Sequence, residues 1–153
     1  MLLIVNEAQT GIGRYSDLIA FTYENEDVVP DILTLSKTLG NSLPLGAVLT
    51  SDKIEHVYIK RDFCFYTTYI NDPLPTAVGD KVLEIVVRDR LVEHSRAMGK
   101  VLYGRLNALK EKYSCIGDVR GRGLMARVEI VKDRETKTSA LALAILALGV
   151  PFA

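Results

Sequence analysis

The sequence lacks the clustered cysteines and histidines that bind metals. It contains two cysteines, Cys64 and Cys115, and two histidines, His56 and His94, and none of these residues stands at the short spacing of a zinc site. Isolated cysteines are typical of proteins in reducing compartments. We therefore expect two free thiols in a cytoplasmic protein.

An excess of charge of either sign is also missing. Nineteen lysines and arginines balance nineteen aspartates and glutamates, so no net field favours a nucleic acid or an anionic membrane as a partner. The segment Ala140–Leu148 is apolar, but it is shorter than the roughly 20 residues that a helix needs to cross a bilayer. No secretion signal follows Met1. We expect no nucleic-acid partner and no membrane association.

The residues that are present predict an α/β fold. The chain has 153 residues, of which 48% are hydrophobic, enough to form a sizeable core. Short apolar runs at Leu2–Val5, Ile32–Leu35 and Gly46–Thr50 are typical of strands buried on both faces. Helical spacing of apolar residues predicts helices from Pro73 to about Asp89 and from Leu91 to Tyr113.

The second half of the chain gives weaker signals. We expect Met98 to fill the core on the inner face of the second helix. Glycine and arginine dominate Gly117–Gly123, which we interpret as a turn rather than as an anion site formed by Arg120 and Arg122. Alternating apolar and polar residues over Leu124–Ile130 predict a half-exposed strand.

A single lysine follows the second apolar run. Lys37 comes two residues after Leu35, where the chain turns toward Gly40. Ligands of open α/β sheets bind beyond the carboxyl ends of the strands, and a desolvated lysine at such a place can attack a carbonyl to form a Schiff base. On position alone, a solvated surface lysine is the simpler interpretation.

A glycine-rich loop follows the first apolar run. Its Gly11-Ile-Gly13-Arg-Tyr-Ser16 segment is similar to a dinucleotide fingerprint. The third glycine of that fingerprint is replaced by Ser16. A nucleotide-binding module is therefore the weakest of the functional alternatives.

Four ordered motifs carry a more specific resemblance. They are Asn6-Glu-Ala-Gln-Thr-Gly-Ile-Gly-Arg14, Pro30-Asp-Ile-Leu-Thr-Leu-Ser-Lys37, Phe65-Tyr-Thr-Thr-Tyr-Ile-Asn-Asp-Pro-Leu-Pro75 and Ile116-Gly-Asp-Val-Arg-Gly-Arg-Gly-Leu-Met125. Together they resemble the class III aminotransferases, which are fold type I enzymes that use pyridoxal 5′-phosphate. The third motif is more similar to 2,2-dialkylglycine decarboxylase than to ordinary family members.

The resemblance implies a division of the chain. Residues 1–90 correspond to the C-terminal part of the large cofactor-binding domain, and residues 91–153 to the start of the small C-terminal α+β domain. The family's long N-terminal half and its C-terminal substrate-binding arginine have no counterpart in this sequence. We therefore expect a partial chain that is inactive alone.

The resemblance also implies roles for individual residues. Lys37 matches the lysine that holds the cofactor aldehyde as an imine and then shuttles the proton. Gln9 matches the glutamine that binds the phenolic oxygen, and Thr68 the threonine that holds the phosphate from the neighbouring subunit. Asn6 stands where the family has an aspartate that keeps the ring nitrogen protonated. An asparagine supplies no charge there, so we expect a weakened electron sink.

A cation site is a further implication of the third motif. Asp72, with backbone carbonyls near Thr68 and Ile70, resembles the segment that binds an alkali metal ion in the decarboxylase subgroup, and oxygen ligands suit a hard cation. An equally good interpretation is that Asp72 caps the following helix.

The expected function is amino transfer between amino acid and keto acid substrates, or decarboxylation coupled to that transfer. The family resemblance further implies a homodimer or a larger homo-oligomer. The alternative is a catalytically impaired partial chain or pseudoenzyme in which Asn6 has replaced the ring-nitrogen aspartate.

Overall fold

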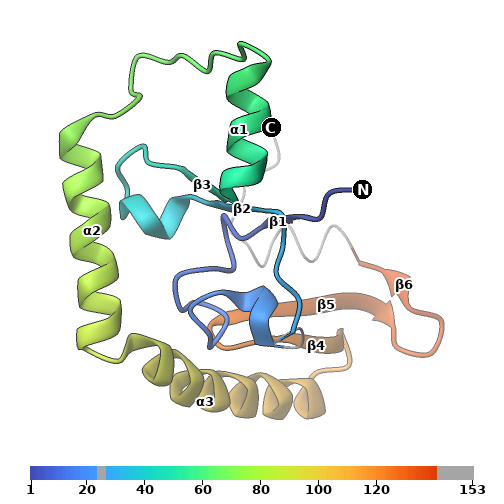
Figure 1. Cartoon of the computed structure of the whole chain (residues 1–153). Helices are drawn as coiled ribbons and strands as arrows, with labels where there is room; N and C mark the ends of the chain where they lie inside the picture. The colour runs from blue at the N-terminus through green and yellow to red at the C-terminus, as the bar shows by residue number, and fades with distance from the viewer. Residues whose placement is uncertain (24–26, 141–153) are drawn as a thin grey trace. The chain divides into compact units, whose positions relative to one another are not determined.

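A computed structural model describes residues 1–23 and 27–140. Figure 1 shows the chain with its helices and strands labelled. The chain divides into two compact units, Met1–Ser95 and a second that begins at Arg96. Each unit is described by itself. No described helix is long and apolar enough to cross a membrane. The predicted apolar segment Ala140–Leu148 lies, apart from its first residue, outside the described residues.

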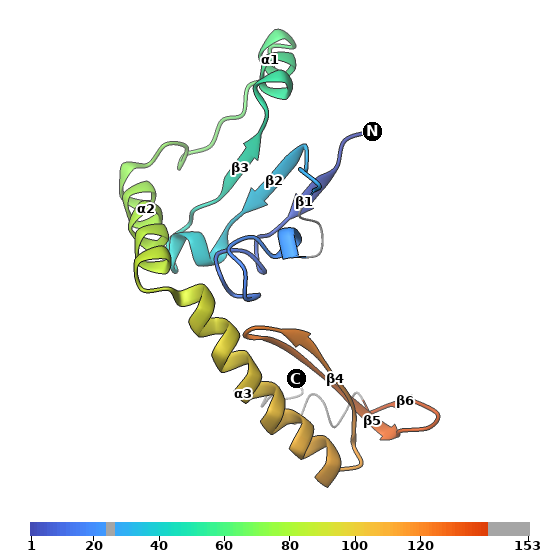
Figure 2. The ribbon, with the colours of Figure 1, turned by 60° about the horizontal axis from the view of Figure 1, so that its bottom comes forward.

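The first unit is built on a three-stranded sheet. It consists of β1 (Ile4–Asn6), β2 (Ile32–Leu35) and β3 (Ala47–Thr50), with β2 in the middle (Figure 2). β1 and β2 are parallel, and β3 is antiparallel to β2. The sequence located all three strands to within about two residues of their ends. Ile4 is 61% exposed and Val48 is 70% exposed, so this sheet leaves apolar side chains uncovered in the part of the chain that the structure describes.

In the described residues of this unit, four helical elements accompany the sheet. They are the short 3-10 helices η1 (Ala20–Tyr23) and η2 (Lys37–Gly40) and the α-helices α1 (Asp52–Lys60) and α2 (Pro73–Arg88). Prolines in the first turn of α2 start it as predicted. The buried core joins Ile12, Leu35, Leu39 and Val86. The glycine-rich loop, β2, η2 and α2 therefore share one apolar cluster.

The second unit contains most of α3 (Leu91–Lys112) and an antiparallel sheet. The strands are β4 (Ile116–Arg122), β5 (Met125–Asp133) and β6 (Thr138–Ser139), with β5 in the middle. The interpretation of Gly117–Gly123 as a turn was wrong. Arg122 pairs with Met125, so the turn consists of only Gly123 and Leu124.

Two glycines in this unit allow the chain to approach itself closely. A Cβ on Gly121, whose φ is +131°, would collide with the Met125 carbonyl and with the Tyr103 hydroxyl, which donates to that carbonyl. A Cβ on Gly99 would lie 2.6 Å from the carbonyl oxygen of Gly123. Helix α3 therefore meets the β4–β5 turn backbone to backbone at Gly99.

The prediction that Met98 fills the core was wrong. Its side chain is 40% exposed, whereas Gly99 is buried and Leu102 and Leu106 are half-buried. The face of α3 toward the hairpin is set by the contact at Gly99. Met98 lies beside this packed face and stays partly exposed.

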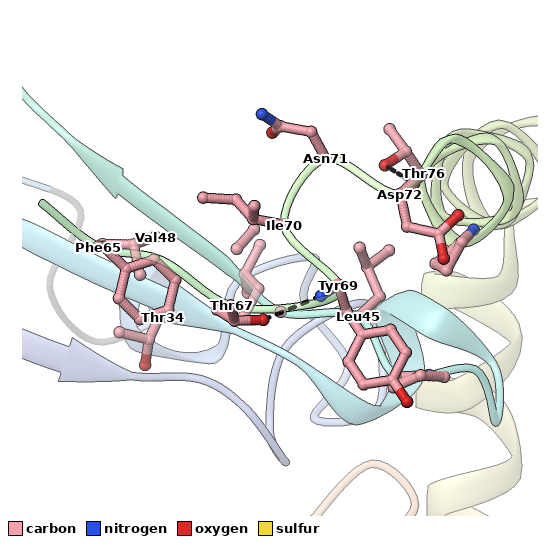
Figure 3. Close-up of a pocket in the computed structure, with 15 residues that line it drawn as sticks. Thr34, Leu45, Val48, Phe65, Thr67, Tyr69, Ile70, Asn71, Asp72 and Thr76 are labelled. Atoms are coloured by element: carbon pink, nitrogen blue, oxygen red, sulfur yellow. Dashed lines mark hydrogen bonds between the residues drawn. The ribbon is translucent and has the colours of Figure 1, made fainter.

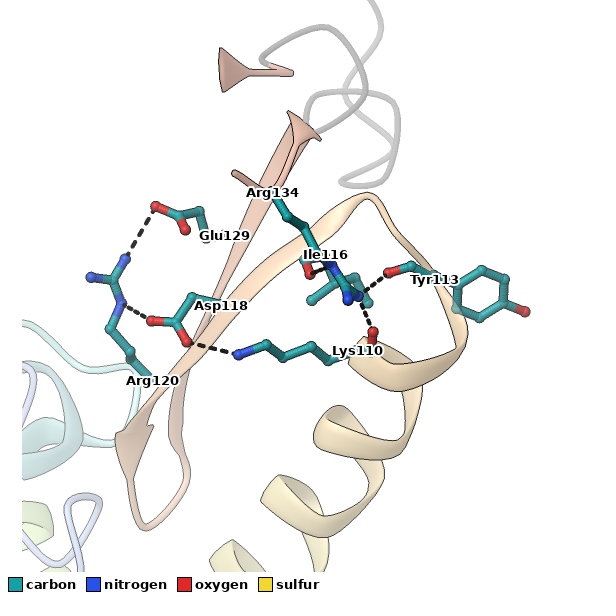
Figure 4. Close-up of polar contacts among 7 residues, drawn as sticks. All are labelled: Lys110, Tyr113, Ile116, Asp118, Arg120, Glu129 and Arg134. Atoms are coloured by element: carbon teal, nitrogen blue, oxygen red, sulfur yellow. Dashed lines mark hydrogen bonds and ion pairs between the residues drawn. The ribbon is translucent and has the colours of Figure 1, made fainter. Parts of the chain in front are cut away.

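Arg134 fastens the end of α3 to the sheet (Figure 4). Its Nε donates to the carbonyl of Ile116 at 3.0 Å, and its Nη2 donates to the carbonyls of Tyr113, at 2.7 Å, and Lys110. The last carbonyls of a helix have no partner within the helix. One guanidinium satisfies two carbonyls at this end of α3 and one at the start of β4.

Arg120 takes part in an ion-pair network within the hairpin. Its guanidinium lies 3.1 Å from Asp118 and 3.5 Å from Glu129, and Lys110 lies 3.1 Å from the other oxygen of Asp118 (Figure 4). The hydrogen bond from Lys110, followed by that from the Val119 backbone, holds the pKa of Asp118 below its usual value. The guanidinium of Arg120 is therefore already paired with two carboxylates of its own hairpin, which agrees with the interpretation that it does not form an anion site.

Candidate functional site

The candidate site lies at the edge where the two parallel strands end. Asn6 is the last residue of β1 and pairs in register with Thr34 of β2. Parallel strands bring their carboxyl ends to one edge of a sheet, so the segments that follow Asn6 and Leu35 leave the sheet on the same side. These segments carry Gln9 and Lys37.

Lys37 and Gln9 meet at this edge. Lys37 Nζ donates to Gln9 Oε1 at 3.4 Å, and both side chains are exposed. The φ of Lys37 is +48°, in the left-handed region that residues other than glycine seldom adopt. Such a conformation costs on the order of 1–3 kcal/mol and is often found at functional sites.

The side chain of Asn6 bridges its own loop and the neighbouring strand. Its Oδ1 accepts from the Ala8 backbone N–H at 3.0 Å and from the Thr34 hydroxyl at 3.2 Å. We had not predicted a role for Thr34. Only the strand register identifies it, because 28 residues separate it from Asn6 in the sequence.

A buried glutamate organises the loop that carries Gln9. Glu7 is only 3% exposed, and its carboxylate accepts from the Phe21 backbone N–H at 2.6 Å and from the Thr10 hydroxyl. Its backbone carbonyl accepts from the Gly11 N–H at 3.0 Å. Sequence reasoning also missed this residue, although a charged side chain directly after an apolar run is a usable signal.

The glycine-rich loop does not have the geometry of a dinucleotide fingerprint. That fingerprint places its glycines at the start of an α-helix, whose N-terminus binds the phosphates. Here Ile12, Gly13 and Ser16 have positive φ, and the next helical element is the short η1. The nucleotide-binding alternative therefore loses its structural basis.

A pocket of about 460 Å³ lies beside the segment between α1 and α2 (Figure 3). Thr34, Thr67, Ile70 and Asp72 are among its lining residues. The carboxylate of Asp72 accepts from the Leu74 N–H at 3.1 Å, and Asp72 is the N-cap of α2. The capping interpretation of Asp72 is confirmed, while the cation site that we predicted with Thr68 and Ile70 stays a prediction.

Thr68 is not part of the cluster around Lys37. Its side chain is exposed, and no hydrogen bond in residues 1–23 and 27–140 joins it to Lys37, Gln9 or Asn6. The predicted role of Thr68 belongs to a neighbouring subunit, so a single chain does not test it.

The three residues at the sheet edge fit pyridoxal phosphate chemically. Lys37 offers a primary amine for the aldehyde. Gln9 turns its oxygen toward that amine, which leaves its amide N–H groups available to an acceptor such as a phenolic oxygen. The Asn6 amide can form a hydrogen bond with a ring nitrogen.

Comparison with known sequences gives consistent relatives. The aminotransferase class-III family model matches residues 1–153. The chain is 52% identical over 130 residues to an aminotransferase of Schizosaccharomyces pombe, covering 85% of this chain and 29% of that protein. It is 42% identical over 141 residues to alanine–glyoxylate aminotransferase 2 homolog 2, mitochondrial, of Arabidopsis thaliana, covering 92% of this chain and 29% of that protein. The chain thus spans less than a third of these relatives.

Solved structures agree with this result and confirm the predicted fold type. An S-selective transaminase from Arthrobacter sp. matches with a TM-score of 0.81 and 35% identity, over 94% of this chain and 31% of that one. The taurine:2-oxoglutarate aminotransferase from Bifidobacterium kashiwanohense, solved with pyridoxal phosphate and glutamate, matches with a TM-score of 0.83 and 27% identity, over 96% and 34%. By sequence and by fold, the chain belongs to the class III aminotransferase family.

Proposed function

We propose that this protein binds pyridoxal 5′-phosphate through Lys37 and transfers amino groups between an amino acid and a keto acid. The observation that carries the proposal is the contact between Lys37 and Gln9 at the carboxyl edge of two parallel strands. An amine and a neutral amide meet there at the place where α/β sheets bind ligands. Membership of the class III family supports the same cofactor.

Lys37 has two tasks in this proposal. Its Nζ would hold the cofactor aldehyde, and the same atom would carry a proton to and from the substrate. When bound, pyridoxal phosphate accepts the electrons of the bond that breaks at the substrate Cα. The Lys37 side chain contacts Gln9 in the structure, so the amine lies at the sheet edge before any ligand arrives.

Gln9 and Glu7 have supporting roles: Gln9 orients the cofactor, and Glu7 holds the loop that carries Gln9. Gln9 would bind the phenolic oxygen of the cofactor through its amide N–H groups. Glu7, fixed by Phe21 and Thr10, keeps the loop in the shape that presents Gln9. Glu7 is buried and faces the loop interior, so we assign it no contact with substrate.

Decarboxylation coupled to amino transfer is a second candidate reaction. The Phe65–Pro75 segment resembles that of 2,2-dialkylglycine decarboxylase, and its residues Ile70 and Asp72 line the pocket of Figure 3. An alkali metal ion held by Asp72 and the carbonyls near Thr68 and Ile70 would give this segment its function. Release of carbon dioxide from a 2,2-dialkylglycine, with and without potassium, tests this candidate.

Assembly into a homodimer or a larger homo-oligomer completes the proposal. Thr68 would bind the phosphate of the neighbouring subunit's cofactor. The segment around it exposes large aromatic side chains, with Phe65 60%, Tyr66 85% and Tyr69 64% exposed. Exposed apolar patches of this kind mark interaction surfaces. Light scattering measures the oligomeric state.

The cellular compartment stays a prediction. We expect the cytoplasm, although the Arabidopsis relative is named as mitochondrial.

The alternative is a pseudoenzyme that has lost activity through Asn6. It predicts a cofactor bound at Lys37 without amino transfer. The two are separated by adding an amino acid donor to the loaded protein and following the cofactor absorbance. A change in absorbance together with keto acid formation supports the enzyme.

Covalent trapping tests the proposal directly. Borohydride reduction of the full-length protein loaded with pyridoxal phosphate, followed by peptide mapping, should find the label on Lys37. The variant Lys37→Ala should lose it. Lys53→Ala, which removes an exposed lysine of α1, should keep it and serves as the control. A label on another lysine, or none, would contradict the proposal.

A further inference from the structure

The orientation of the Asn6 side-chain amide is fixed by its neighbours. The Ala8 backbone N–H is only a donor, so the Asn6 atom 3.0 Å from it must be the oxygen. The Thr34 hydroxyl, 3.2 Å from the same oxygen, can donate as well. The Asn6 NH₂ group therefore points away from both partners. No hydrogen bond in the described parts of the chain engages it.

An aspartate at this position would present a different group. One carboxylate oxygen would accept from Ala8 and Thr34, and the other, negatively charged, would face outward and accept a hydrogen bond. Asn6 presents a donor instead. A protonated ring nitrogen is itself a donor, and two donors cannot share a hydrogen bond, whereas an unprotonated ring nitrogen is an acceptor.

We infer that Asn6 donates its amide N–H to the ring nitrogen of pyridoxal phosphate and holds that nitrogen without a proton. Thr34 is a positioning residue that keeps the amide in this orientation. The inference rests on the proposed function, since it requires the cofactor to bind at Lys37. It goes beyond a missing charge, because the site selects one protonation state of the cofactor.

Nitrogen NMR of the loaded protein tests the inference without measuring activity. The full-length protein is loaded with pyridoxal phosphate that carries ¹⁵N in the ring, and the shift is read at neutral pH. The protein with Asn6 should give the shift of a neutral pyridine. Asn6→Asp should give the shift of a pyridinium. Thr34→Val should show a mixture of the two states or broadening, and Thr34→Ser, which keeps the hydroxyl, should match the unchanged protein.

The possible failures are distinguishable. A pyridinium shift with Asn6 in place, while borohydride still labels Lys37, overturns this inference and leaves the proposed function standing. A Thr34→Val spectrum identical to that of the unchanged protein overturns the positioning role of Thr34. Absence of any label on Lys37 overturns the proposed function and this inference with it.

Discussion

Lys37 Nζ contacts Gln9 Oε1 at 3.4 Å, although the two residues lie 28 positions apart in the chain. The contact exists because β1 and β2 are parallel and end at the same edge. A single hydrogen bond to a charged group contributes on the order of 1.5–3 kcal/mol when it is well formed. At 3.4 Å this bond is long and both side chains are exposed, so we expect its contribution to stability to fall below that range.

Removal of the Gln9 amide should weaken cofactor binding. Gln9→Ala deletes both the contact to Lys37 and the donors for the phenolic oxygen, and a loss of about 1.4 kcal/mol corresponds to a tenfold higher Kd. Equilibrium titration of the full-length protein with pyridoxal phosphate measures it. Asn107→Ala, which removes an exposed amide on α3, should leave Kd unchanged. An unchanged Kd for Gln9→Ala would remove Gln9 from the site.

Restoring the aspartate at position 6 should accelerate turnover. Charge-assisted hydrogen bonds are roughly twice as strong as neutral ones, so Asn6→Asp should lower the barrier by on the order of 1–2 kcal/mol, a rate increase of about 5- to 30-fold. Single-turnover kinetics with an amino acid donor measure the chemical step. An equal or slower rate with aspartate would show that the asparagine is not what limits catalysis.

Two substitutions at Asp72 separate its capping role from cation binding. Asparagine is as good an N-cap as aspartate, so Asp72→Asn should keep the stability of α2 and lose any dependence of activity on potassium. Asp72→Ala should in addition destabilise the protein by about 1 kcal/mol. Chemical denaturation and assays at several potassium concentrations distinguish the two effects. Identical potassium dependence in Asp72→Asn and the unchanged protein would leave only the cap.

Loss of the Arg134 guanidinium should loosen the end of α3. Arg134→Met keeps much of the aliphatic stem and removes the donors to the carbonyls of Lys110, Tyr113 and Ile116, so we expect a loss of roughly 1–3 kcal/mol of unfolding free energy. Arg127→Met, which replaces an exposed arginine of β5, is the matched control. Urea denaturation measures both variants, and equal stabilities would contradict the assigned role.

The ion pair of Asp118 with Lys110 should make stability depend on pH. The pKa of Asp118 lies below its ordinary value of 3.8 in the folded chain, first because of the Lys110 hydrogen bond and then because of the Val119 N–H. The carboxylate therefore stabilises the folded chain at pH values above its ordinary pKa. This contribution is lost as the pH falls through the lowered pKa.

Asp118→Asn and Lys110→Met check this prediction. Both variants should be less stable than the unchanged protein near neutral pH, and the difference for Asp118→Asn should shrink in acid. Thermal unfolding followed from neutral pH down to about pH 2 measures it. A stability difference that stays constant over this range would contradict the linkage.

Sequence reasoning succeeded where local pattern decides the structure. The apolar run Ile32–Leu35 is the strand β2, and the lysine that follows it lies at the sheet edge, because hydrophobicity and chain direction determine both. Pro73 and Asp72 mark the start of α2 by local capping chemistry. The same reasoning failed for Thr34, because its importance depends on the register with Asn6.

The errors in the second unit have a common physical cause. Gly117–Gly123 contains residues that disfavour strands, yet β4 forms there because Gly121 gives the Tyr103 hydroxyl and the Met125 carbonyl the room they occupy. Helical spacing alone predicts a core position for Met98. The contact between Gly99 and Gly123 instead determines which face of α3 packs on the hairpin. Local sequence pattern cannot predict this contact, because the two residues lie 24 positions apart.

The close approach of Gly99 to Gly123 also limits how this unit can change over evolution. Alanine is intrinsically favoured over glycine inside a helix by about 1 kcal/mol. Helix propensity alone would therefore favour replacement of Gly99 by alanine. A Cβ on Gly99 would lie 2.6 Å from the Gly123 carbonyl oxygen, so there is no space for even one methyl group. A homologue with a side chain at this position must therefore also have a different packing of α3 against the β4–β5 hairpin.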